Sequence, residues 1–198
     1  MNFEKNFMQN IEKERNNRVK EVEIKKHLKD YLELEEGDLA SLEVLQTEKL
    51  PAQYQEQLKF LNDQRLKDVQ VVVVPDKLWH KGKQPSESHA SRQMVLFNQK
   101  YFETQDDSAW ACHEFAHCQK YLDQPDDYEK QMQTPAFPEI ASEYNYPNNQ
   151  VELFTFSKQF EFLKQKGLSR NEVMTMIAEQ YDEEHFVFFN KVLDKIYT

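Results

Sequence analysis

Residues 110–119 read WACHEFAHCQ, and this stretch decides how the rest of the chain is interpreted. It contains two histidines and a glutamate in the spacing H-E-x-x-H, at His113, Glu114 and His117. On a helix, residues four apart lie on one face, so both imidazoles can bind one metal ion. Glu114 lies about 100° further round the helix, within reach of a water molecule bound to that ion. The spacing therefore predicts a metal site with His113 and His117 as ligands.

Zinc is the metal that suits this pair of imidazoles. It binds nitrogen ligands and, in catalytic sites, keeps one coordination position for water. The ion lowers the pKa of that water to about 7, and Glu114 can accept the proton while the resulting hydroxide attacks a carbonyl group. We therefore predict Zn²⁺ as the cofactor and Glu114 as the catalytic general base.

The motif has the pattern of a helix that is buried on two sides. On a helical wheel, an apolar stripe lies about 140–200° away from His113. The stripe consists of Ala111, Phe115, Cys118 and Leu122. Asp106, Asp107 and Ser108 are candidate N-cap residues for this helix, and Pro125 ends it. The helix is thus predicted to pack on one face and to present the metal ligands on the other.

Two strands are predicted upstream of this helix. The run VQVVVV at 69–74 is rich in β-branched residues and too short for a buried helix. The run MVLFNQKYF at 94–102 is expected to form the second strand, and residues 76–92 are expected to form a loop between the two.

Capping residues mark the helices downstream. Asn148 or Asn149 can cap a helix that runs to Gly167, and Ser169 with Glu172 forms a capping box for the final helical region. Strands in one short region and helices elsewhere predict an α+β fold that is mostly helical with a small sheet.

The chain of 198 residues has a length that suits one compact domain. Residues 1–66 carry thinly scattered apolar positions among many charged ones, which predicts a charged helical extension packed on a core at 67–198.

Composition excludes several classes of function. Three glycines are too few for a glycine-rich phosphate-binding loop, and a net charge of −10 disfavours nucleic acid as a partner. The first residues lack the apolar core of a secretory signal, and no run of about 18 apolar residues is present to span a membrane. Cys112 and Cys118 would share one helix, where a mutual disulfide is implausible. We therefore expect a cytoplasmic protein with free thiols and no membrane partner.

The motif with its uncharged flanking residues resembles the zincin superfamily of metallopeptidases, over roughly residues 94–165. The glycine and third histidine of the metzincin extension are absent, so the resemblance points to the gluzincins, in which a distant glutamate is the third ligand. It implies a zincin-like fold and zinc-dependent hydrolysis of peptide bonds. One departure is Gln119, where these proteases usually carry an apolar residue.

Glu152 is the first candidate for the third ligand. In the helix predicted after Asn149 it shares a face with Phe156 and Phe160, and a glutamate in an apolar stripe is costly to bury unless a partner such as a metal compensates its charge. The stretch around it also resembles the part of small gluzincin-like domains that supplies this ligand. The competitors are Glu139 and Glu143 in PEIASEY, which resembles the ligand helix of thermolysin-like enzymes, followed by His185.

We therefore predict a zinc metallopeptidase that acts on a peptide or protein, which can add itself as an extended strand to an exposed sheet edge above the motif helix. One alternative is a catalytically inactive zincin fold that serves as a binding or regulatory module with a structural zinc. Another is a helical interaction protein in which the motif is fortuitous.

Overall fold

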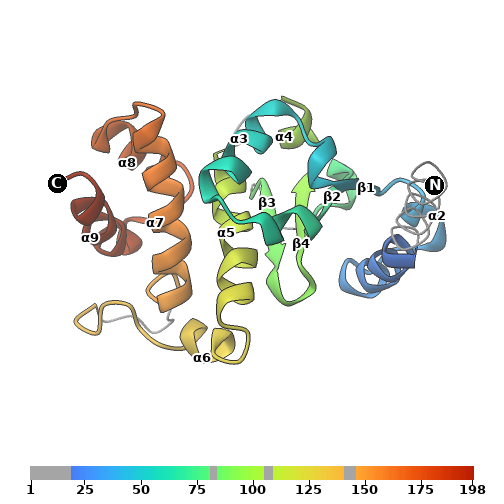
Figure 1. The fold of residues 1–198 in the computed structure, drawn as a ribbon, viewed down its shortest axis with the longest axis horizontal. Coiled ribbons are helices and arrows are strands. Elements are labelled where there is room, and N and C mark those ends of the chain that lie inside the picture. The colour runs from blue at the N-terminus through green and yellow to red at the C-terminus, as the bar shows by residue number, and fades with distance from the viewer. Residues whose placement is uncertain (1–18, 81–83, 105–108, 141–145) are drawn as a thin grey trace, which may run out of the picture.

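The computed structural model describes residues 19–80, 84–104, 109–140 and 146–198. They form an α+β fold in which helices surround a mixed sheet of four strands (Figure 1). The described part of the chain starts in a helix, which covers residues 19–31. The other helices are α2 (Glu36–Leu39), α3 (Ala52–Leu61), α4 (Gln99–Thr104), α5 (Trp110–Asp123), α6 (Tyr128–Met132), α7 (Gln150–Gln165), α8 (Arg170–Ala178) and α9 (Phe186–Ile196). The strands are β1 (Glu43–Gln46), β2 (Gln70–Val74), β3 (Ser86–His89) and β4 (Met94–Asn98).

The sheet has the order β1-β2-β4-β3. The central strands β2 and β4 are parallel, and each pairs with an antiparallel outer strand. Both central strands are buried along their whole length, which explains their nearly continuous apolar sequences. The short polar strand β3 lies at one edge of the sheet, next to the motif helix α5.

Alternating side chains of the two central strands build two separate cores. Val71 and Val95 point toward α3 and α5, where they join a cluster that includes Phe115. Val72 and Leu96 point to the opposite face, where they pack with residues of the N-terminal segment, including Leu28 of the helix 19–31. Figure 1 shows the result, a sheet between this N-terminal helix and α5.

Helix α7 lies against the side of α5 that faces away from the sheet, and α8 and α9 cover α7 in turn (Figure 1). An aromatic core that includes Phe156, Phe160, Phe188 and Phe189 joins these three helices. Every residue from Trp110 to Cys118 is therefore buried, as predicted for a helix with two packed faces.

Several predicted caps are confirmed. Asn149 caps α7, Ser169 and Glu172 form the capping box of α8, and Gly167 has the positive φ of 92° that suits a residue just past a helix end. Helix α5 ends at Asp123, shortly before Pro125. The three predicted cap residues of α5, at 106–108, lie outside the described residues.

Three secondary-structure predictions are wrong. The N-terminal third is not purely helical, because β1 at residues 43–46 forms the edge strand beside β2. The expected loop at 76–92 contains β3, whose sequence SESH lacks the β-branched residues that mark a strand and whose pairing with β4 places it in the sheet. The second predicted strand ends at Asn98, and residues 99–104 turn into a short helix.

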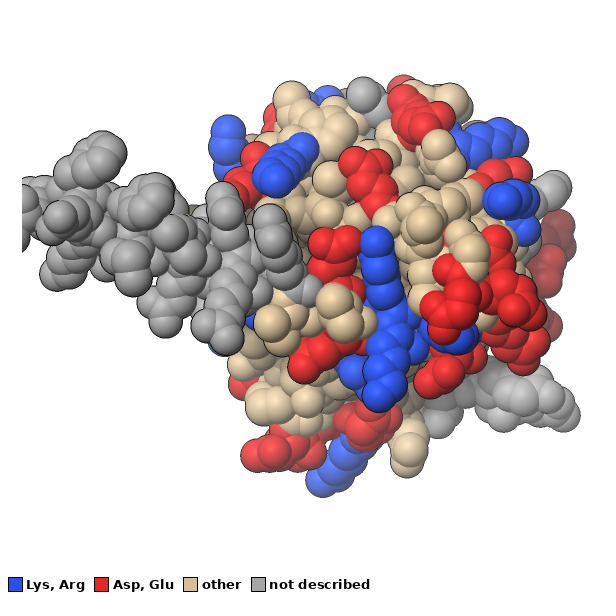
Figure 2. Space-filling model, turned by 90° about the vertical axis from the view of Figure 1, so that its right-hand side faces the viewer, with Lys and Arg blue, Asp and Glu red and all other residues tan. Residues whose placement is uncertain are grey.

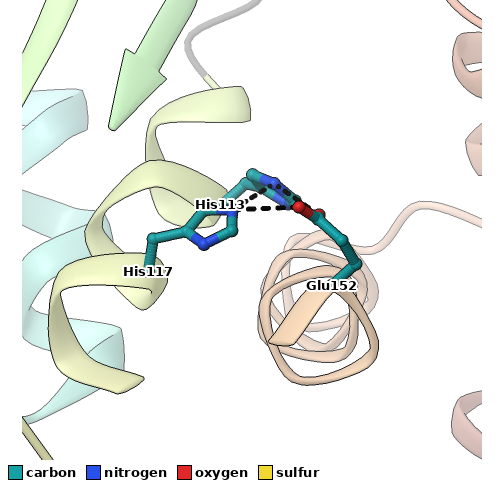
Figure 3. A group of neighbouring side chains, drawn as sticks. All are labelled: His113, His117 and Glu152. Carbon is teal, nitrogen blue, oxygen red and sulfur yellow. Dashed lines mark hydrogen bonds and ion pairs between the residues drawn. The ribbon is translucent and has the colours of Figure 1, made fainter. Parts of the chain in front are cut away.

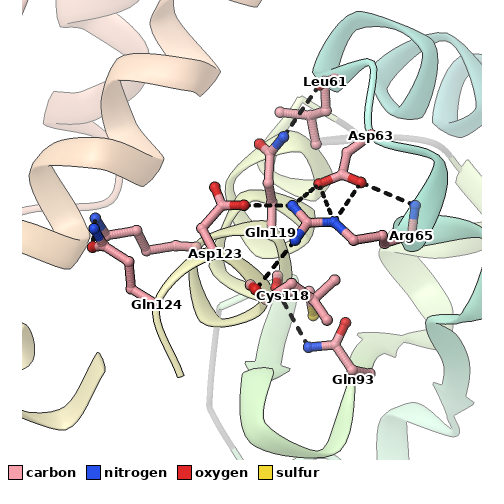
Figure 4. Close-up of polar contacts among 10 residues, drawn as sticks. Leu61, Asp63, Arg65, Gln93, Cys118, Gln119, Asp123 and Gln124 are labelled. Atoms are coloured by element: carbon pink, nitrogen blue, oxygen red, sulfur yellow. Dashed lines mark hydrogen bonds and ion pairs between the residues drawn. The ribbon is translucent and has the colours of Figure 1, made fainter. Parts of the chain in front are cut away.

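A polar network fixes the carboxyl end of α5 (Figure 4). Arg65 binds the carboxylates of Asp63 and Asp123, and its Nη1 donates a hydrogen bond to the backbone oxygen of Leu122 (3.2 Å). Such a donor satisfies a carbonyl that has no partner within the helix. The network thus ties α5 to the segment that follows α3.

The end of the molecule formed by the N-terminal helix and α2 carries acidic and basic side chains side by side (Figure 2). Lys25 pairs with Glu21, and Lys29 pairs with Glu36. Within the described parts of the chain, no helix has the length and apolar character needed to cross a membrane.

Candidate metal centre

Helices α5 and α7 bring three possible metal ligands together (Figure 3). Nε2 of His113 lies 3.0 Å from Nε2 of His117 and 3.2 Å from Oε2 of Glu152. Nε2 of His117 lies 3.6 Å from Oε1 of Glu152. All three side chains are buried, and this group could hold a metal ion.

These separations fit a tetrahedral zinc ion. Zinc binds imidazole nitrogen and carboxylate oxygen at about 2.0–2.2 Å, which places the ligand atoms of an ideal tetrahedron about 3.3–3.5 Å apart. Two of the observed distances, 3.0 and 3.2 Å, are slightly shorter than this range, and the third, 3.6 Å, is slightly longer. Two imidazoles and one carboxylate are also a donor set that catalytic zinc sites use.

The start of α7 places Glu152. Asn149 Oδ1 accepts hydrogen bonds from the backbone N–H groups of Val151 (3.0 Å) and Glu152 (2.9 Å), so the cap holds the first turn that carries the carboxylate. Thr155 Oγ1 lies 3.4 Å from Glu152 Oε2 and donates to it. Burial raises the pKa of Glu152 above its usual range, while the nearby His117 and the Thr155 hydrogen bond oppose this shift. A bound cation would compensate the cost of this buried charge.

Both histidines are in the protonation state that a metal requires. Burial lowers the pKa of His113 to about 4, against a smaller opposite effect of Glu114. Burial likewise lowers the pKa of His117 to about 4, opposed by Glu152. Neutral imidazoles offer a free lone pair, so neither ring has to lose a proton before it binds a metal near neutral pH.

Glu114 is held by the edge strand β3. Ser86 Oγ donates a hydrogen bond to Oε1 of Glu114 (3.1 Å), and both side chains are buried. Burial raises the pKa of Glu114, while His113 and the hydrogen bonds from Ser86 and Ser88 act in the opposite direction. A general base benefits from a pKa raised toward neutrality, so this environment is compatible with proton transfer.

Tyr128 of α6 contacts His117 from outside the motif. Its hydroxyl lies 2.9 Å from Nδ1 of His117, on the side of the ring away from the three-ligand group. Tyr128 could not be identified from the sequence, because one tyrosine among nine carries no local signal that it meets His117.

A cleft of about 660 Å³ opens beside the three-ligand group. Strand β3 forms one side of it, and Trp110, Tyr146 and Tyr181 form another part, in which the two tyrosine hydroxyls lie 2.9 Å apart. The N-terminal helix adds His27 and Tyr31 to the lining. This segment, which the sequence predicts as a charged helical extension packed on the core, therefore contributes to the cleft wall.

The free edge of β3 faces outward at two residues. The backbone N–H of Asn98 donates to the oxygen of Pro85, which is one hydrogen-bonded pair of the antiparallel β3–β4 ladder. Because such pairs alternate along the ladder, the backbone groups of Ser86 and Ser88 point away from β4. Both serines line the cleft, and within the described residues no further strand pairs with this edge of β3.

The other sequence candidates lie elsewhere. Glu139 is exposed and pairs with Lys191 (2.7 Å), and His185 lies 3.6 Å from Glu184. Glu143 lies outside the described residues. Cys112 and Cys118 are free and buried, as expected for small residues that pack along α5.

No family model matches the chain, and searches of curated proteins and of solved structures also found no match. The resemblance to zincins thus rests on the motif and its surroundings.

Proposed function

We propose that the protein is a zinc-dependent peptidase in which His113, His117 and Glu152 hold the metal and Glu114 is the general base. The observation that carries this proposal is the buried group of three ligands, 3.0–3.6 Å apart, beside a cleft that Glu114 also lines. A zinc ion in this position would supply a water molecule that is activated near neutral pH and would polarise a carbonyl group.

Glu114 would accept the proton of the attacking water and then pass it to the leaving amine. Ser86 donates a hydrogen bond to Oε1 of Glu114, and Ser88 also hydrogen-bonds this carboxylate, so β3 orients the base beside the cleft. Glu114 is therefore restrained by the serines of β3, and its raised pKa favours the return of the proton to the leaving group.

The substrate class follows from the strand edge. An extended peptide can pair with the outward backbone groups of Ser86 and Ser88, which gives affinity without dependence on side chains. Pairing at this edge would lay the peptide across the cleft that contains Glu114 and the three ligands.

A binding or regulatory module with a structural metal is the second candidate. The contribution of His27 and Tyr31 to the cleft wall favours it, because an N-terminal helix over the cleft can restrict access. Structural zinc sites have four protein ligands, however, whereas the described residues bring together three. Three ligands beside a cleft are the arrangement of a catalytic site.

The first test is metal content. We expect close to one zinc per chain in the wild type and in Glu114→Gln, and loss of zinc in His113→Ala and Glu152→Ala. If the wild type neither contains nor takes up zinc, the proposal is contradicted. That result would favour a helical interaction protein in which the motif is fortuitous.

The second test separates the enzyme from the binding module. The zinc-loaded wild type is incubated with an unbiased peptide library and the products are analysed by mass spectrometry. We expect cleavage that Glu114→Gln abolishes at unchanged zinc content. Equal cleavage by this variant would refute the role of Glu114, and peptide binding without cleavage by either protein would favour the module.

A further inference from the structure

Tyr128 stands out among the residues around the three-ligand group. It belongs to α6, which follows the turn after α5, and its side chain is buried with its hydroxyl 2.9 Å from Nδ1 of His117. The contact joins two buried polar atoms, so each gives the other a hydrogen-bond partner.

The chemistry of imidazole decides the direction of this hydrogen bond in the metal-bound state. Nε2 of His117 faces His113 and Glu152, so a metal would take the lone pair of that nitrogen. A neutral ring that offers Nε2 carries its proton on Nδ1. The Tyr128 oxygen would then accept a hydrogen bond from Nδ1–H.

The hydroxyl of Tyr128 is held in place by packing. The ring of Tyr128 belongs to a cluster with Ala90 and Val151, and the ring of Tyr121 lies 5.4 Å away. This packing leaves the ring little freedom to turn the oxygen away from His117. Nδ1 of His113, by contrast, has no hydrogen-bond partner among the described residues.

We propose that Tyr128 is a positioning residue that fixes the ring orientation and the Nδ1–H tautomer of His117 for metal binding. This inference rests on the proposed metal site and adds a residue that is not itself a ligand. Partners of this kind orient ligating histidines, and their loss costs about 10–100-fold in metal affinity.

The test compares zinc affinity in the wild type, Tyr128→Phe and Tyr121→Phe, measured by competition with a chromophoric chelator. Phenylalanine keeps the ring and removes only the oxygen. We expect Tyr128→Phe to bind zinc about 10–100-fold more weakly. Tyr121→Phe, which alters the neighbouring ring in the same cluster, should bind like the wild type. Thermal unfolding of the metal-free proteins checks that both variants fold.

One spectroscopic readout distinguishes positioning from a general effect on stability, and a second checks which nitrogen of His117 carries the proton. The visible spectrum of the Co²⁺-substituted protein should change in Tyr128→Phe and stay unchanged in Tyr121→Phe, because the spectrum reports the ligand geometry. In the zinc-loaded wild type, NMR of the histidine nitrogens should place the proton of His117 on Nδ1. This second measurement needs no variant.

The outcomes separate this inference from the proposed function. If Tyr128→Phe has the same zinc affinity and the same Co²⁺ spectrum as the wild type, the proposed role of Tyr128 is overturned. The proposed metal site is not affected by that result. A proton on Nε2 of His117 in the zinc-loaded protein would also overturn the role of Tyr128. A wild type that binds no zinc would overturn the proposed function and this inference together.

Discussion

Gln119 shows how a single polar residue is accommodated at the end of the motif helix. Its Nε2 donates a hydrogen bond to the backbone oxygen of Leu61 at the end of α3 (3.3 Å), beside the network around Arg65 (Figure 4). An apolar side chain could not donate this bond. Gln119 therefore has a structural role, which is to tie α5 to α3.

A second residue-scale contact joins the N-terminal helix to the cleft. Nε2 of His27 lies 3.1 Å from Nδ1 of His89 on β3, and Nε2 of His89 lies 2.9 Å from the carboxylate of Glu87. Tyr31 also donates a hydrogen bond to Glu87. Between two neutral rings, the N–H of one can donate to the lone pair of the other.

This contact predicts a pH dependence. Burial lowers the pKa of His27 below its usual value of 6.5, and the nearby Arg92 and His89 add to this shift, while Asp30 opposes it. The released helix would bind a proton more readily than the docked helix, so docking is complete above pH 6.5 and weakens as the pH falls below it. Hydrogen exchange of residues 19–31 should be faster at pH 5.5 than at pH 7.5, after correction for intrinsic rates.

The control for this pH effect is His27→Gln, which keeps a polar side chain that does not titrate. Its corrected exchange rates over residues 19–31 should differ much less between the two pH values. Equal protection of the wild-type helix at pH 5.5 and 7.5 would contradict the role of the His27–His89 contact.

At the scale of elements, α7 couples a helix cap to the candidate metal site. Asn149 Oδ1 binds the backbone N–H of Glu152, so the cap and the ligand share one helical turn. We predict that Asn149→Ala lowers the free energy of unfolding by about 1 kcal/mol and also weakens zinc binding. Chemical denaturation and chelator competition measure the two effects.

Ser169→Ala provides the matched control for this prediction. Ser169 caps α8 through a capping box and is exposed, and α8 supplies none of the three ligands. The variant should lose a similar amount of stability at unchanged zinc affinity. If both variants bind zinc like the wild type, the cap of α7 does not order the ligand.

Strand β3 is the element on which the two sides of the cleft meet. Ser86 and Ser88 act on Glu114 from one face of the strand, and Glu87 and His89 contact the N-terminal helix from the other. Successive side chains of a strand point to opposite faces, so this division follows from the alternation of the sequence SESH. A shift of the N-terminal helix would therefore act on the strand that restrains Glu114.

At the scale of the whole molecule, the candidate metal site lies where two layers meet. The two histidines come from α5, which packs on the sheet, and Glu152 comes from α7, which packs on α8 and α9. A metal held by all three would link these layers. Burial also raises the pKa of both Glu114 and Glu152, which means that their charged forms are costly without a compensating cation.

We therefore predict that zinc stabilises the folded protein. A ligand present at 100 times its Kd adds about 2.7 kcal/mol, which for a chain of this size corresponds to an increase in Tm of roughly 5–10 °C. Calorimetry with zinc and after chelation measures the shift. His117→Ala should show little response to either treatment. If the wild type is shown to gain and lose zinc but its Tm does not change, the proposed link between the layers is contradicted.

The sequence alone determined the features that depend on local pattern. The spacing of His113 and His117, the buried strand at 70–74, the cap at Asn149 and the position of Glu152 on an apolar helical face could all be predicted. Each of these features follows from hydrophobic periodicity or from helix capping. Both depend only on residues that are close together in the sequence.

Only the tertiary structure decided the features that depend on distant partners. Strand β3 exists because β4 offers it a partner, Tyr128 meets His117 across a turn, and helix 19–31 reaches the cleft through contacts with β3. These polar segments carry no strong periodic signal of their own. Their conformations are set by hydrogen bonds and packing between residues that lie far apart in the sequence or in separate elements, and such contacts exist only once the chain has folded.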